Sequence, residues 1–142
     1  MDLNAREQTL IISHTDDEAA ITGLQQRRAY FGRNSNLSLF VVHSNMTIPC
    51  DFATHNVTIG RGQPKDSPDG HIDLSDYGGR EMGVSRLHAR FIRTNVVLML
   101  KDMGAMNGTF INGERLSPLK TYVVCDGDEI QFGSLTLRAQ FG

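Results

Sequence analysis

From residue 37 to residue 141 the chain alternates short apolar segments with turn residues, at intervals that leave little room for helices. Segments rich in Val, Leu, Ile and Phe and bounded by Gly, Asn and Asp are typical of β-strands. A succession of such strands predicts an all-β sandwich or barrel rather than an α/β fold. The expected strands cover residues 37–43, 46–52, 57–60, 72–74, 88–93, 96–101, 109–111, 120–124, 129–132 and 135–141.

Residues 1–36 show a different pattern. Thr15 and Glu18 have the spacing of a helix capping box. Apolar side chains then follow near helical spacing, at Ile21, Leu24 and Phe31. We therefore expect a helix over residues 16–30, which Gly23 weakens by about 1 kcal/mol relative to Ala. A loop at residues 32–36 separates this N-terminal extension, residues 1–36, from one domain over residues 37–142.

Two expected strands, 88–93 and 96–101, are joined by a tight turn at Thr94-Asn95. Because a hairpin reverses the chain once, Ser85 before the first strand and Asn107 after the second are expected at the same end of a sheet. Residues 61–85 form the one long connection, which is rich in Gly, Pro and Asp and contains a further cationic residue, Arg80. Long irregular connections in small domains tend to be functional.

The composition argues against some classes of protein and of binding site. The 142 residues have a formal net charge of -2, which disfavours a broad basic surface for nucleic acid but not a local cationic pocket. Cys50 and Cys125 lie in apolar segments without the spacing of a zinc site, so we interpret them as buried reduced thiols. No signal peptide or membrane-spanning segment is visible. We expect a cytoplasmic protein that needs no metal or cofactor and binds neither nucleic acid nor membrane.

Four polar motifs stand between or beside the expected strands. They are Gly60-Arg61, Ser85-Arg86-Leu87-His88-Ala89, Asn107-Gly108-Thr109 and Asn112-Gly113. In this order they resemble the forkhead-associated (FHA) domain, and the segment over residues 72–85 resembles bacterial members in particular. The resemblance covers residues 37–141. It implies a β-sandwich of about eleven strands that binds phosphothreonine peptides through loops at one end.

A binder of phosphothreonine needs hydrogen-bond donors, because this residue carries nearly two negative charges and three acceptor oxygens. By the resemblance, Arg61 and Ser85 hold the phosphate, and Asn107 bonds to the peptide backbone beside it. The planar fork of an arginine suits that task. The predicted phosphopeptide-binding set is Arg61, Ser85, Arg86, Asn107, Gly108 and Thr109. The predicted structural support of the site is Gly60, His88, Asn112 and Gly113. For Arg86, a surface salt bridge remains an alternative.

One departure from the family pattern lies directly before Asn107. Many members have Ser-Thr there, and this chain has Ala105-Met106. A side-chain donor to a charged group contributes roughly 1.5 to 3 kcal/mol, so its loss weakens affinity by about tenfold or more. Two hypotheses follow: a phosphothreonine-dependent adaptor in Ser/Thr kinase signalling, or a phospho-independent scaffold built on a degenerate FHA domain. The partner is then a phosphothreonine-containing protein, a Ser/Thr kinase, or the chain's own N-terminal tail.

An enzyme is not expected. Ser85 and His88 would have to act as nucleophile and base, yet no GxSxG, HExxH or paired-carboxylate pattern accompanies them. Thr15 has two interpretations. It is either the cap of the expected helix or, as in some bacterial members of the family, a kinase target that the domain itself binds.

Overall fold

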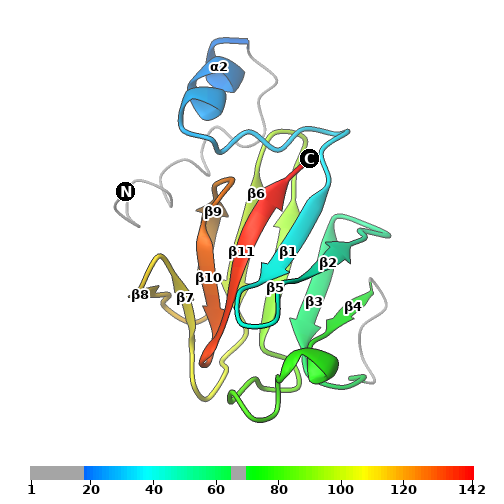
Figure 1. Cartoon of the computed structure of the whole chain (residues 1–142). Coiled ribbons are helices and arrows are strands. Elements are labelled where there is room, and N and C mark those ends of the chain that lie inside the picture. The colour runs from blue at the N-terminus through cyan, green and yellow to red at the C-terminus, as the bar shows by residue number, and fades with distance from the viewer. Residues whose placement is uncertain (1–17, 65–69) are drawn as a thin grey trace.

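The computed structural model describes residues 18–64 and 70–142, and it consists of two β-sheets packed face to face with one short helix at one end (Figure 1). Six strands form one sheet, in the order β2-β1-β11-β10-β7-β8, and five form the other, in the order β4-β3-β5-β6-β9. The all-β sandwich predicted from the sequence is confirmed. In chain order the elements are α2 (Glu18–Gln26), β1 (Leu37–Val41), β2 (Met46–Cys50), β3 (Asn56–Gly60), β4 (His71–Asp73), the 3-10 helix η2 (Ser75–Tyr77), β5 (Ala89–Arg93), β6 (Leu98–Asp102), β7 (Thr109–Ile111), β8 (Glu114–Arg115), β9 (Thr121–Val124), β10 (Glu129–Phe132) and β11 (Leu135–Phe141).

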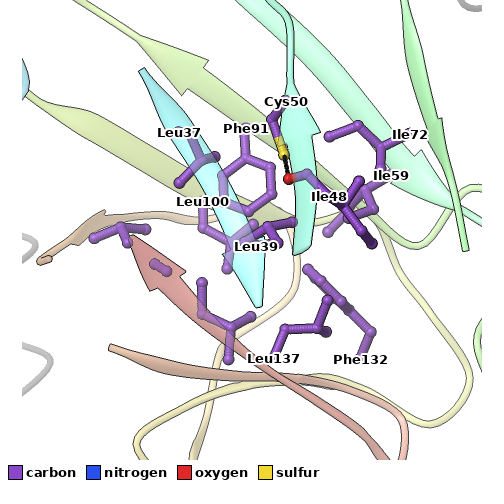
Figure 2. Packing of buried hydrophobic residues seen from close by; sticks show 14 of the residues in the cluster. Leu37, Leu39, Ile48, Cys50, Ile59, Ile72, Phe91, Leu100, Phe132 and Leu137 are labelled. Atoms are coloured by element: carbon purple, nitrogen blue, oxygen red, sulfur yellow. Dashed lines mark hydrogen bonds between the residues drawn. The ribbon is translucent and has the colours of Figure 1, made fainter. Parts of the chain in front are cut away.

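The main hydrophobic core fills the space between the two sheets (Figure 2). Strand β1 shows how the sequence builds it, because alternate residues along a strand point to the same face. Leu37, Leu39 and Val41 are accordingly buried, while the residues between them are partly exposed. Cys50 belongs to this core, and burial, together with the nearby carboxylate of Asp51, raises the pKa of its thiol to about 12.

One strand pair differs from the antiparallel pairing of all the others in the described part of the chain. Strands β3 and β4 run parallel, with Ile59 opposite Ile72. A parallel neighbour requires a crossover rather than a tight hairpin. In the sequence, residues 61–70, at the start of the longest expected loop, connect the two strands.

Several strand ends differ from the expected ones by one or two residues, and two further differences have local reasons. The strand expected over 96–101 begins two residues later, because the Thr94 hydroxyl accepts hydrogen bonds from the backbone N–H groups of Val96 (3.1 Å) and Val97 (3.0 Å). This contact lengthens the turn. Strand β8 was not predicted, since it has only two residues; it follows a turn in which Asn112 and Gly113 have positive φ of 51° and 83°.

The N-terminal helix is shorter than expected and ends at Gln26 rather than at residue 30. Arg28 adopts a left-handed φ of 60°, and its N–H donates to the carbonyl of Gln25 (3.0 Å). The N–H of Ala29 donates to the carbonyl of Leu24 (2.7 Å). These two bonds form a Schellman motif, which terminates a helix. Phe31, which we assigned to the helix face, lies beyond this stop and is buried in the main core instead.

Helix α2 packs over a second, smaller hydrophobic cluster, which joins the N-terminal segment to residues of the five-stranded sheet and the loops that flank it. In β6 and β9, Leu98 and Val124 belong to the main core, whereas Met99 and Val123 belong to the second cluster. Its buried members are Leu24, Ala29, Val96, Val97, Met99, Val123 and Cys125. The described part of the expected extension therefore shares a core with the sandwich.

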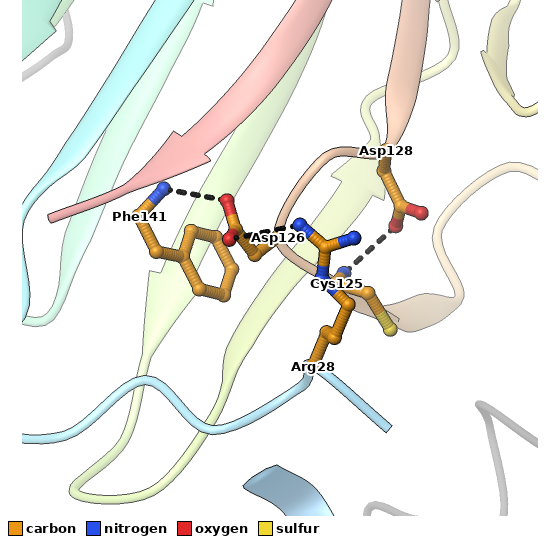
Figure 3. Close-up of polar contacts among 5 residues, drawn as sticks. All are labelled: Arg28, Cys125, Asp126, Asp128 and Phe141. Atoms are coloured by element: carbon orange, nitrogen blue, oxygen red, sulfur yellow. Dashed lines mark hydrogen bonds and ion pairs between the residues drawn. The ribbon is translucent and has the colours of Figure 1, made fainter. Parts of the chain in front are cut away.

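Polar contacts fix the same junction (Figure 3). Arg28 pairs with Asp126 (Nη2 to Oδ2, 3.3 Å), and the other carboxylate oxygen of Asp126 accepts from the N–H of Phe141 (3.0 Å). Farther along the sheet, the Arg93 guanidinium donates to the carbonyl of Gly32 (2.6 Å) and lies over the Phe31 ring. Thr15, the expected cap and kinase target, lies outside the described residues. Within residues 18–64 and 70–142, no helix has the length and apolarity to cross a membrane.

Candidate functional site

Strand pairing brings three of the sequence motifs to one end of the sandwich. Ala89, the first residue of β5, lies opposite Asp102 at the end of β6 and opposite Ile59 near the end of β3. The chain after β3, before β5 and after β6 therefore leaves the sheet at the same end. In Figure 1 this end lies at the bottom, and α2 lies at the top.

Gly60-Arg61 is packed directly against Ser85-Arg86. A Cβ atom added at Gly60 would lie 1.9 Å from the carbonyl oxygen of Arg86, so only glycine allows this approach. The N–H of Arg61 donates to the carbonyl of Ser85 (3.1 Å), and its side-chain Nε donates to the carbonyl of Val84 (2.9 Å). These bonds hold the Arg61 guanidinium in a defined direction beside the loop that carries Ser85.

His88 is fully buried beneath this loop and connects it to the Asn107-Gly108 loop. The N–H of Ser85 donates to Nδ1 (3.0 Å), and Nε2–H donates to the carbonyl of Gly108 (2.8 Å). A backbone N–H only donates and a carbonyl only accepts, so the ring is the neutral tautomer protonated at Nε2. Burial lowers the pKa of His88, against the opposing effects of the Gly108 carbonyl and Asp102.

The same contacts bear on the nucleophile and base arrangement considered above. The chain bends at residues 86 and 87, so the His88 ring reaches back to the backbone of Ser85, although residues three apart in an extended strand would lie far from each other. Both ring nitrogens are occupied by backbone groups. Neither is left to take a proton from the Ser85 hydroxyl.

Asn107 lies on a tight turn beside the same loop. The N–H of Gly108 donates to the carbonyl of Ala105 (3.3 Å), which closes a β-turn with Met106 and Asn107 at its tip. The Asn107 side chain is exposed and donates to the carbonyl of Gly83 (2.9 Å). Ala105 is buried, whereas the Met106 side chain is 87% exposed. The turn therefore presents a thioether beside Asn107, where a hydroxyl is common in the family that the motifs resemble.

Three of the predicted site residues are not exposed at this end of the sandwich. Thr109 is fully buried, and its hydroxyl donates to Asp102 (2.6 Å), so the expectation that it contacts a peptide is wrong for its side chain. Asn112 and Gly113 lie at the far end of β7. There the Asn112 side chain donates to Asp128 (2.9 Å) and accepts from the N–H of Glu129 (2.9 Å), which supports the turn before β10.

A cavity of about 630 Å³ opens at this end of the sandwich, beside Arg61. Three arginines and one glutamate contribute to its wall. The lining residues are Arg61, Gly62, Gln63, Pro64, Ser75, Arg80, Glu81 and Arg86. Ser85 and Asn107 do not line it. The Ser85 carbonyl accepts from the N–H of Arg61, which does, and the Asn107 side chain donates to the carbonyl of Gly83.

Sequence motifs did not identify the residues that shape one side of this cavity. The Asp73 carboxylate accepts hydrogen bonds from the N–H groups of Gly62 (2.7 Å) and Ser75 (2.9 Å). Burial alone raises the pKa of Asp73, but the bonds from Ser75 and Gly62 outweigh this effect and lower it. An Asp two residues before a Ser, at the end of a short strand, is the only sequence signal for this support. In the part of the chain described, no group of three or more His, Cys, Asp or Glu side chains is placed to hold a metal.

Comparison with known proteins agrees with the fold. The family model of the FHA domain matches residues 57–133. The glycogen accumulation regulator GarA of Mycolicibacterium smegmatis is 31% identical over 84% of this chain and 65% of its own length. The oxoglutarate dehydrogenase inhibitor of Corynebacterium jeikeium is 40% identical over 49% of this chain and 43% of its own length. The chain thus spans less than two thirds of either relative.

Solved structures show the same architecture. One is the FhaA FHA domain, solved in complex with the intracellular domain of another protein. It superposes with a TM-score of 0.53 at 25% identity, over 75% of this chain and all of that chain.

Proposed function

Since the chain belongs to the FHA domain family, whose members bind phosphothreonine, we propose that it is a phosphothreonine-dependent interaction module of Ser/Thr kinase signalling. The observation that carries the proposal is the arginine-lined cavity, with Arg61 held beside the Ser85 loop. Its guanidinium supplies charge and paired donors to a phosphoryl group. Ser85 and Asn107 complete the contacts, to the phosphate and to the peptide backbone.

A role as binder rather than catalyst fits the chemistry of the site. Its buried histidine is neutral and bonded on both sides to backbone, and three of the four charged side chains that line its cavity are arginines. The two relatives named above are a regulator and an inhibitor. We infer that this chain acts by binding a phosphorylated protein, such as a Ser/Thr kinase or one of its substrates.

The test is calorimetry with a peptide selected from a phosphothreonine library and its unphosphorylated twin. We expect binding of the phosphorylated peptide only. Arg61→Ala should remove binding and keep the fold, since the side chain is only half-buried and makes one backbone bond. Arg61→Lys retains the charge without the planar fork, so it should bind more weakly than the native chain but better than Arg61→Ala. A library without phospho-selective peptides would refute the proposal.

One observation favours a second candidate function. The exposed Met106 and the absence of a hydroxyl at residues 105–106 fit a phospho-independent scaffold that retains the fold of the family. Under that hypothesis, pull-downs and oligomeric size stay unchanged after phosphatase treatment. The calorimetric comparison of the two matched peptides separates the two functions directly.

A further inference from the structure

Side chains on the outer face of the five-stranded sheet form rows that cross the strands. Residues two apart along a strand point to the same face. In one row, Ile92 of β5 lies opposite Met99 of β6, which lies opposite Val123 of β9. These three side chains contribute to the second hydrophobic cluster, over which α2 packs. The next row, two residues nearer to the Arg61 end of the sheet, lies outside this cluster.

This next row places two cations directly opposite each other. Arg90 of β5 pairs with Lys101 of β6. Both side chains point away from the main core, because the core contains their neighbours in the sequence, Phe91 and Leu100. Opposite side chains on adjacent strands have Cβ atoms about 5 Å apart, and like charges there destabilise a sheet. The pair therefore opposes folding of the chain.

Nothing in the described part of the chain compensates for this repulsion. Neither Arg90 nor Lys101 makes a side-chain hydrogen bond or an ion pair with residues 18–64 or 70–142. The Nε atom of Arg90 is also shielded from solvent. The six-stranded sheet shows the contrast, because Arg138 lies opposite Glu129 on its outer face. A shielded donor without a partner is uncommon in a folded chain and calls for an explanation.

An exposed apolar side chain lies beside the same row. Leu119 is 62% exposed and has a left-handed φ of 65°, which is rare for a bulky residue. Its N–H donates to the carbonyl of Asp102 (2.9 Å), the residue that follows Lys101 at the end of β6. Lys120, which is also exposed, comes next in the chain. Backbone strain of this kind is concentrated at binding and active sites.

We propose that Arg90, Lys101 and Leu119 bind an acidic, unphosphorylated segment of a partner protein. A carboxylate of Asp or Glu lies between the two cations, where one anion neutralises both. The Arg90 side chain turns toward it, which gives its Nε–H the partner that it lacks in the free chain. An apolar residue of the same segment covers Leu119.

The charge of the surface favours carboxylates over nucleic acid. Arg90, Lys101 and Lys120 belong to a chain with a formal net charge of -2, and they do not make the broad basic surface that nucleic acid requires. Neither Arg90 nor Lys101 lines the cavity beside Arg61. Binding at this surface therefore needs no phosphothreonine, and the inference goes beyond the proposed function.

The experiment uses a displayed library of unphosphorylated peptides, selected on the native chain. We expect enrichment of Asp or Glu together with a large apolar residue. Synthetic peptides with the enriched sequences are then measured by calorimetry. Arg90→Gln and Lys101→Gln should each weaken binding about threefold, as for an exposed ion pair. Leu119→Asn, which tolerates the left-handed backbone, should also weaken it.

The stability of the free chain gives a second readout, which a purely structural role would move in the other direction. Because the two cations repel each other, Lys101→Gln should raise the urea midpoint of unfolding while it weakens peptide binding. Lys101→Glu should do both more strongly, since it pairs with Arg90 inside the chain. Arg138→Gln is the matched control. It removes a charge opposite Glu129 on the other sheet, so it should neither raise the midpoint nor change the affinity.

Arg61→Ala separates this surface from the phosphothreonine site and should bind the selected peptides with native affinity. Loss of these peptides in Arg61→Ala would place them in the cavity and overturn the proposal. It also fails if no acidic sequence is enriched, if Arg90→Gln and Lys101→Gln bind like the native chain, or if Lys101→Gln lowers the urea midpoint together with the affinity. Failure of the phosphothreonine proposal would leave this inference standing.

Discussion

Met106 is the single residue at which the site departs most from its family. The tip of the 105–108 turn presents this side chain 87% exposed, and no packing contact requires a thioether there. Met106→Thr places a hydroxyl on a turn whose backbone is already fixed by Asn107 and Gly108. A donor to a charged group contributes roughly 1.5 to 3 kcal/mol. We therefore expect Met106→Thr to tighten phosphothreonine binding by about tenfold.

The measurement is calorimetry with the library-selected peptide. Met46→Thr is the matched control, since Met46 is also an exposed methionine but lies on β2 away from the cavity. An equal gain for both variants, or for the unphosphorylated peptide, would show that the hydroxyl does not contact the phosphate.

His88 makes stability depend on pH, with a sign that follows from its contacts. Its pKa in the folded chain lies below the ordinary value of 6.5, because burial favours the neutral ring. At pH values between the folded-state pKa and the ordinary pKa, His88 is protonated more often in the unfolded chain than in the folded one. The contribution of His88 to the free energy of unfolding is therefore complete above pH 6.5. It falls as the pH drops below 6.5, by up to about 1.4 kcal/mol per pH unit for one proton.

Urea unfolding between about pH 5 and pH 8 measures this slope. Burial also lowers the pKa of His71, so His71→Asn serves to subtract the contribution of that residue. The NMR signal of the Ser85 amide reports on His88 directly, because that N–H donates to Nδ1. A His88 ring that titrates at or above pH 6.5 in the folded chain would contradict this account.

At the scale of single residues, the sequence predicted which loops come together but not every contact between them. The structure packs Gly60-Arg61 against Ser85-Arg86, as expected from motifs whose side chains and spacing are characteristic. Thr109 was misplaced, since a motif does not reveal that its hydroxyl points inward to Asp102. The support from Asp73 and the position of Arg80 in the cavity wall depend on how a long connection folds, and no local pattern encodes that.

At the scale of elements, α2 is the part whose stability depends most on its docking. A nine-residue helix is marginal by itself in water, and Gly23 in its interior adds conformational freedom to the undocked state. A Cβ atom at Gly23 would meet nothing within 4 Å. Gly23→Ala should therefore stabilise the docked helix by about 0.5 to 1 kcal/mol.

Hydrogen exchange of residues 18–30 tests this expectation. Protection should rise about two- to fivefold in Gly23→Ala, with no change in the strands. Gly60→Ala should instead destabilise the chain, because the added Cβ would lie 1.9 Å from the carbonyl oxygen of Arg86 and the backbone would have to move. Lower protection of α2 in Gly23→Ala would contradict the assignment.

Elements were predicted well where turn chemistry marked them. The strands 109–111, 129–132 and 135–141 have the expected bounds, since Asn-Gly, Asp-Gly and Gly-Ser turns flank them. The end of α2 was missed because an arginine, rather than a glycine, takes the left-handed position at residue 28. The parallel β3–β4 pair was missed because composition and turn residues do not specify the direction in which two strands pair.

At the scale of the whole molecule, two hydrophobic clusters share one chain, and each contains one cysteine. Cys50 lies in the main core between the sheets, and Cys125 lies in the cluster beneath α2. Both thiols are buried, and neither belongs to a disulfide. Separate clusters allow separate openings, because local units of a fold open with their own free energies. The cysteines therefore report on undocking of α2 and on global unfolding independently.

Leu24→Ala should separate these two events. Leu24 is the helix residue most buried in the second cluster, and a Leu→Ala change in a core costs about 2 to 5 kcal/mol. If α2 opens as a unit, this cost appears in the docking equilibrium, and alkylation of Cys125 under native conditions accelerates about thirtyfold or more. Cys50 should keep its slow rate, since its thiol remains buried between the sheets with a pKa of about 12.

Mass spectrometry of the alkylated peptides measures both rates in one sample. Equal acceleration at Cys50 and Cys125 would mean that the clusters open together, and the N-terminal segment would then be an inseparable part of the sandwich rather than an appendage able to detach from it.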